Sequence, residues 1–351
     1  MKRIVLATVL ACAAMGASAD VTVYGRLDTG LLWNNTADTD IVTMESGIAG
    51  ASRLGFKGSE KINDDLTVGF VLESTVKADT GEAFKSGFDR DCYLYINTNY
   101  GNLRIGRSGA LGGGVSGGMF AGKVSPFGVV YKAAASTEIH AVESRFDNMV
   151  RYDLPKMGGL KLAVQVASGT EADKAAAWKL NKAKDAFVFD PAVAADRAGA
   201  EYSHDADMYY GVGAKYQAGA FGANLVVSTT EFKAGEEDLN VVAGVNYNFG
   251  VAKVWLAGNY YESGVKGHDH YGVAVSAAAP MFGGELSATV GYGEDGYAAA
   301  EDKEVYMVGA AYKYPLSKQT YLYAAAGFDQ AKQGKAEVKT TEAMFGMVHN
   351  F

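Results

Sequence analysis

The last seven residues of the chain, 345–351, constrain its fold more than any other stretch. Phe345, Met347, His349 and Phe351 share one side of this stretch at the two-residue period of a β-strand, and the chain stops on the aromatic residue. An open sheet ending in this way would expose aromatic side chains on an unpaired edge, which proteins normally protect with charge or proline. Pairing of the terminal strand with the first strand removes the edge. A closed barrel also satisfies every backbone group inside a bilayer, so the stretch predicts the seam of an all-β transmembrane barrel.

Alternation and turn signals predict sixteen antiparallel strands. An even number is expected when both termini of a barrel meet on the same side of the membrane. The predicted strands cover residues 21–33, 50–60, 65–77, 88–99, 102–107, 144–153, 159–168, 208–217, 220–231, 238–249, 251–262, 270–279, 284–294, 303–314, 319–330 and 341–351.

The connections between these strands alternate in length. Seven short connections carry the Gly, Asn, Asp and Pro of tight turns, which we place at the periplasmic rim. Eight longer polar segments are predicted to be extracellular loops. They cover residues 34–49, 78–87, 108–143, 169–207, 232–237, 263–269, 295–302 and 331–340.

The phase of each strand predicts which side chains face lipid. Leu66, Val68, Phe70 and Leu72 share one face, with Glu73 on the other. A charge on the lipid face costs about 2–4 kcal/mol at the bilayer midplane, which defines the register. A soluble sandwich shows the same alternation. The transmembrane interpretation therefore depends on the strand number, the terminal aromatic, the absence of disulfides and an export signal together.

The first nineteen residues have the pattern of a signal peptide. Lys2 and Arg3 form a positive region, residues 4–16 are apolar, and residues 17–19 form a small-residue cleavage site. The mature chain, residues 20–351, is then one barrel domain. An alternative is lipoprotein processing at Cys12, which ends a Val-Leu-Ala-Cys sequence. Beyond the signal peptide there is no run of eighteen apolar residues.

Charge and cysteine content exclude some functions. The formal net charge is −8, and loss of Lys2 and Arg3 with the signal peptide makes it −10, which argues against nucleic-acid binding. After removal of Cys12, Cys92 is alone, so no internal disulfide is expected. A free cysteine is usually a small buried side chain, so we expect Cys92 to pack on a strand rather than to act as a reactive thiol.

Five sequence blocks together resemble the general diffusion porins of Gram-negative outer membranes, of the beta-proteobacterial and neisserial type. The resemblance implies a homotrimer in outer-membrane lipid that admits small hydrophilic solutes and ions, needs no cofactor and inserts through the barrel-assembly machinery. It also implies that this machinery recognises the terminal strand, with Phe345, Met347, His349 and Phe351. The blocks are residues 21–28, 52–58, 145–152, 314–323 and 346–351.

The same phase argument places four arginines on the inner wall. Arg26, Arg53, Arg90 and Arg145 alternate with apolar residues, for example Arg90 with Tyr93 and Tyr95, and Arg145 with Phe146, Val150 and Tyr152. By resemblance, these positions form the basic wall of the pore constriction. Arginine keeps its proton and is weakly hydrated, so such a wall holds a fixed positive field. The alternative is solvated arginines in a wide pore. Three carboxylates are predicted to line the pore as well: Asp28, Glu73 and Asp147.

In the family, the third external loop folds back into the barrel. Here this loop is 108–143, and the stretch 108–137 contains no Asp or Glu. A basic wall facing a loop without counter-charge predicts a preference for anions. The alternative is weak selectivity set by the acidic external loops. By resemblance, the constriction loop residues are Lys123, Ser125, Pro126, Phe127, Gly128 and Lys132.

Other functions receive less support. The sequence His268-Asp269-His270 has no third ligand nearby, so we predict no metal site. No nucleophile motif or phosphate-binding loop indicates an enzyme. Two alternatives stay open. A substrate-specific channel would favour aromatic side chains along the pore, and only three Trp are present. A plugged structural or adhesive barrel would carry no current.

The signal-peptide prediction is tested by the amino terminus of the exported protein. We expect cleavage after Ala19, so that the mature chain starts at Asp20. N-terminal sequencing and intact mass of protein extracted from outer membranes measure this directly. A lipid-modified terminus at Cys12 would contradict the prediction.

Overall fold

A computed structural model describes most of the mature chain. The described residues are 21–115, 118–119, 125–127, 130–135, 145–168, 178–181, 186–189, 207–232, 236–264, 268–297 and 301–351. The expected signal peptide, residues 1–19, lies outside them.

Sixteen antiparallel strands close into one barrel, as predicted from the sequence. Two further strands of the same sheet, β2 (Thr39–Ser46) and β5 (Glu82–Ala83), belong to connections, and β10 (Trp178–Asn181) and β11 (Ala186–Phe189) form a separate hairpin. The barrel strands are β1 (Thr22–Thr36), β3 (Arg53–Asn63), β4 (Leu66–Lys77), β6 (Cys92–Thr98), β7 (Gly101–Gly109), β8 (Arg145–Asp153), β9 (Leu160–Ser168), β12 (Met208–Ala218), β13 (Phe221–Glu231), β14 (Glu237–Asn248), β15 (Lys253–Glu262), β16 (His268–Met281), β17 (Gly284–Tyr297), β18 (Lys303–Pro315), β19 (Thr320–Gln333) and β20 (Ala336–Asn350).

The first and last strands form the seam of the barrel. They pair in antiparallel register from Arg26 opposite Asn350 to Thr36 opposite Thr340. Beyond β20, the N–H of Gly25 donates to the carbonyl of Phe351 at 3.0 Å, and the N–H of Phe351 donates back at 3.1 Å. The other edge of β1 pairs with β3, so neither edge of β1 is left open.

Strand boundaries differ most from the prediction where a hairpin extends into a predicted loop. The pairing of β19 with β20 continues to Gln333 opposite Ala336, so residues 336–340 are strand rather than loop. Similarly, β2 pairs with the end of β1 up to Thr36 opposite Thr39. We predicted loops here because these segments are polar. Strands that extend above the membrane are polar on both faces, so composition alone does not distinguish them from loops.

The two faces of the wall differ as the phase argument predicts. On β19, Leu322 is 41% exposed, whereas Tyr323 and Ala325 are buried. On β9, Val164 and Val166 are exposed while Ala163 and Gln165 are buried. The exposed side chains belong to the outer face, and the buried ones face the lumen.

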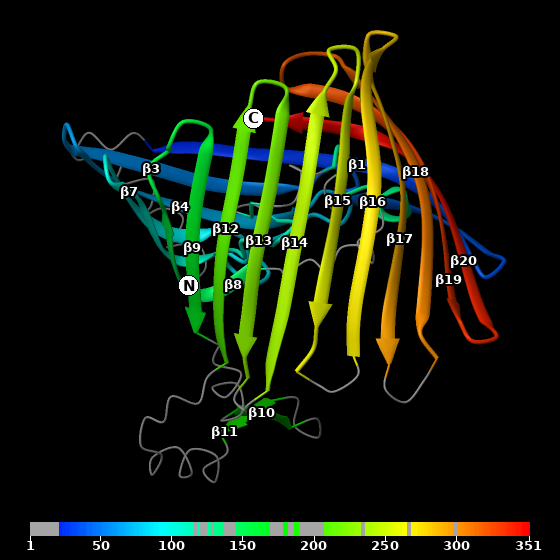
Figure 1. Ribbon diagram of the computed structural model, residues 1–351, viewed down its shortest axis with the longest axis horizontal. Coiled ribbons are helices and arrows are strands. Elements are labelled where there is room, and N and C mark those ends of the chain that lie inside the picture. Colours follow the sequence, from blue (N-terminus) through cyan, green and yellow to red (C-terminus); the bar gives the residue numbers. More distant parts are fainter. Residues whose placement is uncertain are drawn as a thin grey trace.

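Figure 1 shows tight turns at one end of strands β12 to β18, and β10 and β11 lie beyond the other end. We call these the turn end and the loop end. Only one short helical segment occurs among the described residues, the 3-10 helix η1 (Lys132–Ala134). No helix in this part of the chain is long and apolar enough to cross a membrane.

The seam predicts a specific effect of enlarging Gly25. A Cβ atom at this position would collide with the ring of Phe351 and with the carbonyl of Arg53. We therefore expect Gly25→Val to destabilise the barrel by about 1–3 kcal/mol. Urea unfolding in lipid vesicles measures this. Ala324→Val, which places the same side chain on the exposed outer face, is the control. Equal stability of the two variants would contradict the role of the seam.

Candidate functional site: the pore wall and the loop inside it

A group of arginines lines one side of the lumen. Arg26 and Arg53 lie opposite each other on β1 and β3. The Nε of Arg90 donates to Oε1 of Glu73 at 2.5 Å, and the Nε of Arg53 lies 3.6 Å from Oε2 of the same carboxylate. The hydroxyl of Tyr24 also donates to Glu73, at 3.2 Å. Glu73 therefore sits between two guanidinium groups and holds them in place.

Arg145 is linked to this group through a carboxylate that the sequence analysis did not single out. Its Nε lies 3.7 Å from Oδ1 of Asp91, which also accepts a hydrogen bond from the hydroxyl of Ser108. Arg145 and Arg90 are close enough to interact electrostatically. The four predicted arginines thus form one continuous group along the wall.

The phase argument was wrong for the neighbours of Arg90. Leu94 is 61% exposed on the outer face, so Tyr93 and Tyr95 face the lumen instead of lipid. Arg90 still reaches the lumen because it precedes β6 in an irregular segment. There, the N–H of Glu73 bonds Asp91, and the N–H of Arg90 bonds Glu73. Two residues thus oppose one, as in a β-bulge, and the alternation shifts at this point.

A second irregularity changes the face of Phe146, which was expected to point toward lipid. Its ring stacks on Tyr209 with 4.3 Å between ring centroids, and Tyr209 is buried on the lumen side. Asn148 has a φ of +49°, and the register of β7 with β8 shifts between Gly106 and Ser108. Asp147, expected to line the pore, forms an ion pair with Arg107 at 2.5 Å.

Asp28 was expected to line the pore, but its side chain has a structural role. Its side chain points inward but is 0% exposed. The N–H groups of Ala49 and Gly50 donate to it at 2.6 and 2.8 Å, and the hydroxyl of Tyr323 donates at 2.8 Å. Asp28 therefore holds the segment after β2 against the wall and does not contact pore water.

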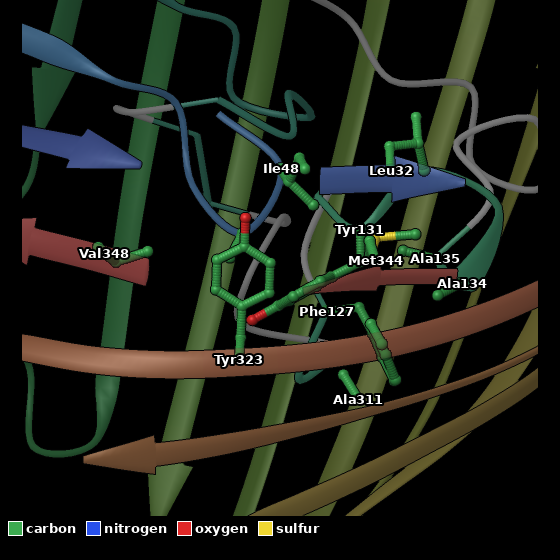
Figure 2. Packing of buried hydrophobic residues seen from close by; sticks show 12 residues of the cluster. Leu32, Ile48, Phe127, Tyr131, Ala134, Ala135, Ala311, Tyr323, Met344 and Val348 are labelled. Carbon is green, nitrogen blue, oxygen red and sulfur yellow. The ribbon is translucent and has the colours of Figure 1, made fainter. Parts of the chain in front are cut away.

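The described parts of the segment 108–143 pack against the inner wall. Phe127, Tyr131 and Ala134 belong to a buried cluster with Tyr323 of β19 and Met344 of β20. Figure 2 shows these side chains meeting beside the strands. Ala134 lies so close to the backbone of β18 and β19 that a Cβ at Gly309 or Gly327 would collide with it. Glycine at these two positions leaves room for the loop.

Glu342 on β20 fastens the same part of the loop. Its buried carboxylate accepts the N–H of Ala133 at 2.8 Å and the side-chain amide of Asn34 at 2.8 Å. A third bond joins the N–H of Tyr131 to the carbonyl of Ile48 at 2.7 Å. A buried carboxylate with two donors holds its partners firmly, because losing either bond leaves a desolvated charge.

The earlier part of the loop contacts a different region of the wall. Leu111 and Met119 form a buried cluster with one residue each of β9, β13, β14 and β15, namely Ala163, Val226, Val242 and Ala257. The side-chain amide of Asn224 donates to the carbonyl of Met119 at 2.6 Å. The described loop residues therefore contact two separate regions of the inner wall.

The residues predicted for the constriction loop differ in their contacts. Lys132 forms an ion pair with Glu45 at the end of β2, and Phe127 is buried. Ser125 accepts the N–H of Phe127 at 3.1 Å, across Pro126. Lys123 and Gly128 lie outside the described residues.

Several residues of the site were missed by sequence reasoning. Three of them are carboxylates: Asp91 lies beside Arg145, Glu342 accepts a hydrogen bond from the loop backbone, and Glu45 pairs with Lys132. Lys313 adds a cation on the inner wall, with its Nζ 5.7 Å from the centre of the Tyr131 ring. The phase of Glu342 and Lys313 predicts the lumen side, but nothing in the sequence indicates what they contact.

The site contains no clear arrangement for metal chemistry. In the described ranges, no group of three or more His, Cys, Asp and Glu residues is positioned to hold a metal ion. Among these residues, His270 contacts one carboxylate, that of Asp295, at 2.6 Å.

The sequence matches the family model described as Gram-negative porin over residues 5–334. This chain belongs to the Gram-negative porin family. A porin protein of Bordetella pertussis is 25% identical with full coverage of both chains. Outer membrane porin protein 32 of Delftia acidovorans is 26% identical over 93% of this chain and 88% of its own. The major outer membrane protein P.IB of Neisseria meningitidis is 24% identical, with full coverage of both.

Solved porin structures share the barrel. The anion-selective porin from Comamonas acidovorans superposes with a TM-score of 0.70 at 22% identity, covering 95% of this chain and 100% of that one. A trimer form of OmpT from Vibrio cholerae superposes at 0.64 and 14% identity, with coverage of 95% and 99%. The porin family and fold place the chain in the outer membrane of a Gram-negative bacterium and point to a channel rather than an enzyme.

The anchor at Glu342 predicts a difference between two substitutions. Glu342→Ala leaves the N–H of Ala133 without its acceptor, and we expect a loss of about 1–3 kcal/mol in unfolding free energy. Single-channel current should also become more variable, because the loop segment is held less firmly. Glu342→Gln keeps an acceptor oxygen and is the matched control. The prediction fails if the two variants behave alike in urea unfolding and in current recordings.

Proposed function

We propose that this porin forms a water-filled channel for passive diffusion of small hydrophilic solutes and ions, with a preference for anions. The observation that carries the proposal is the continuous arginine group on the inner wall. Arg26, Arg53, Arg90 and Arg145 stand beside three carboxylates, Asp28, Glu73 and Asp91, so positive charge is in excess. Asp28 is also enclosed by its donors and adds little to the field in the pore.

The loop supports the same sign of selectivity. The stretch 108–137 supplies no carboxylate to oppose the arginines. External acidic residues act over about 8 Å at physiological salt, so charges at the narrowest part of the lumen have the larger effect on passing ions. The structural similarity to an anion-selective porin agrees with this sign.

Assembly follows the same family pattern in our proposal. We infer a homotrimer surrounded by outer-membrane lipid, which the trimer form of a structurally similar porin supports. We also infer that the barrel-assembly machinery recognises the terminal strand, where Phe345, Met347 and Phe351 are exposed on the outer face.

Ion selectivity is tested by the reversal potential in a KCl gradient across planar bilayers. We expect an anion-preferring value for the wild type. Arg53→Glu should shift it toward cations, because the change places a second carboxylate beside Glu73. Lys85→Glu makes the same charge change at an exposed residue after β5, and we expect a much smaller shift.

Three results would contradict the proposal. A cation-preferring wild type would reject the anion preference. Equal shifts for Arg53→Glu and Lys85→Glu would reject the role of the wall. A barrel that inserts into the bilayer without carrying current would favour the plugged alternative.

A further inference from the structure

The lumen contains a second polar site near the loop end of the barrel. A cavity of about 450 Å³ lies on the inner wall between β8 and β15, and Arg145 lies at one side of it. Tyr209, Thr230 and Asp238 occupy one register row across β12, β13 and β14, which brings them side by side. The volume is within the usual range for small-molecule sites, about 300–1,000 Å³.

Four aromatic residues contribute to the lining of this cavity. Phe146 stacks on Tyr209, and Phe232 and Tyr261 contribute two further rings to the lining. The hydroxyl of Tyr261 donates to Oδ2 of Asp238 at 3.2 Å, which places this ring beside the carboxylate. Four aromatic side chains, Phe146, Tyr209, Phe232 and Tyr261, thus line the same cavity as Asp238.

The carboxylate of Asp238 has neutral donors. Among the described residues, its bonds come from the N–H of Thr230 at 2.6 Å and from the hydroxyl of Tyr261. The two nearby charges of the lining are already in ion pairs, Arg145 with Asp91 and Asp147 with Arg107. The cavity therefore combines aromatic side chains with the negative charge of Asp238.

We propose that this cavity binds an organic ammonium ion. The negative face of an aromatic ring attracts a cation, and several rings around a carboxylate form the arrangement that recognises quaternary ammonium groups. A small inorganic cation would lose more hydration than these rings replace. An anion would be repelled by Asp238.

The position of the site gives it a consequence for conduction. The cavity lies on the same inner wall as the arginine group and includes Arg145. Arg145 of the lining is paired with Asp91, and the other arginines of the group would repel an ammonium ion held by Asp238, so the ion would remain at the loop end. The volume that it occupies there would reduce the current. This inference goes beyond the proposed diffusion function.

The experiment uses the full-length mature porin in planar bilayers and, in parallel, in detergent for titration calorimetry. Choline is the probe. Its neutral isostere, 3,3-dimethylbutan-1-ol, is the matched control, because it has the same shape without the charge. We expect choline added on the loop side to reduce the current in a saturable way and to give a binding isotherm. The alcohol should do neither.

Variants identify the residues involved. We expect Asp238→Asn and Phe232→Ala each to weaken choline binding by at least about tenfold, since each removes one attractive component. Asp64→Asn removes an equal charge at the exposed turn between β3 and β4 and should leave binding unchanged. Heat-modifiable gel mobility shows that each variant is folded.

The results separate this proposal from the proposed function. A normal ion current with no choline isotherm would overturn the ammonium site and leave the diffusion channel intact. Equal effects of choline and the alcohol, or of Asp238→Asn and Asp64→Asn, would also overturn it. A choline isotherm in a barrel that carries no current would support the site and reject the channel.

Discussion

The closure of β1 onto β20 is the constraint on which the rest of the structure depends. In a bilayer, an open strand edge would leave a row of backbone groups without partners, each at a cost of several kcal/mol. The pairing from Arg26 opposite Asn350 to Thr36 opposite Thr340 removes that cost. Closure also creates a barrel wall whose outer face contacts lipid and whose inner face encloses a solvent-filled lumen. Every inward residue then becomes a candidate for function.

The lumen is shaped by small residues as much as by large ones. Gly309 and Gly327 let Ala134 approach the wall, and Glu342 bonds the loop backbone at the same place. These contacts hold an apolar loop segment, with Phe127 and Tyr131, against the inner wall. A loop held by buried hydrogen bonds can present fixed charges, or their absence, to a passing ion. Selectivity thus depends on packing as well as on arginine.

Charges of the lumen are arranged in pairs rather than as isolated groups. Glu73 holds Arg53 and Arg90, and Asp91 lies beside Arg145. These pairs limit the cost of placing guanidinium groups in a partly buried wall, and they reduce the field that the wall produces. The excess of arginine determines the sign of the field. Near the loop end, by contrast, the carboxylate of Asp238 accepts hydrogen bonds from the neutral donors Thr230 and Tyr261.

The sequence by itself determined the barrel, its sixteen strands and the inward phase of regular strands, because a two-residue period between lipid and water is a local property of each strand. It could not predict Tyr93, Tyr95 and Phe146 in the lumen. A bulge beside Arg90 and a left-handed Asn148 shift the alternation, and both depend on pairing with a neighbouring strand. Only the tertiary structure decided that Asp28 is buried and that Glu342 holds the loop. These roles arise from contacts between residues far apart in the chain, which no local pattern records.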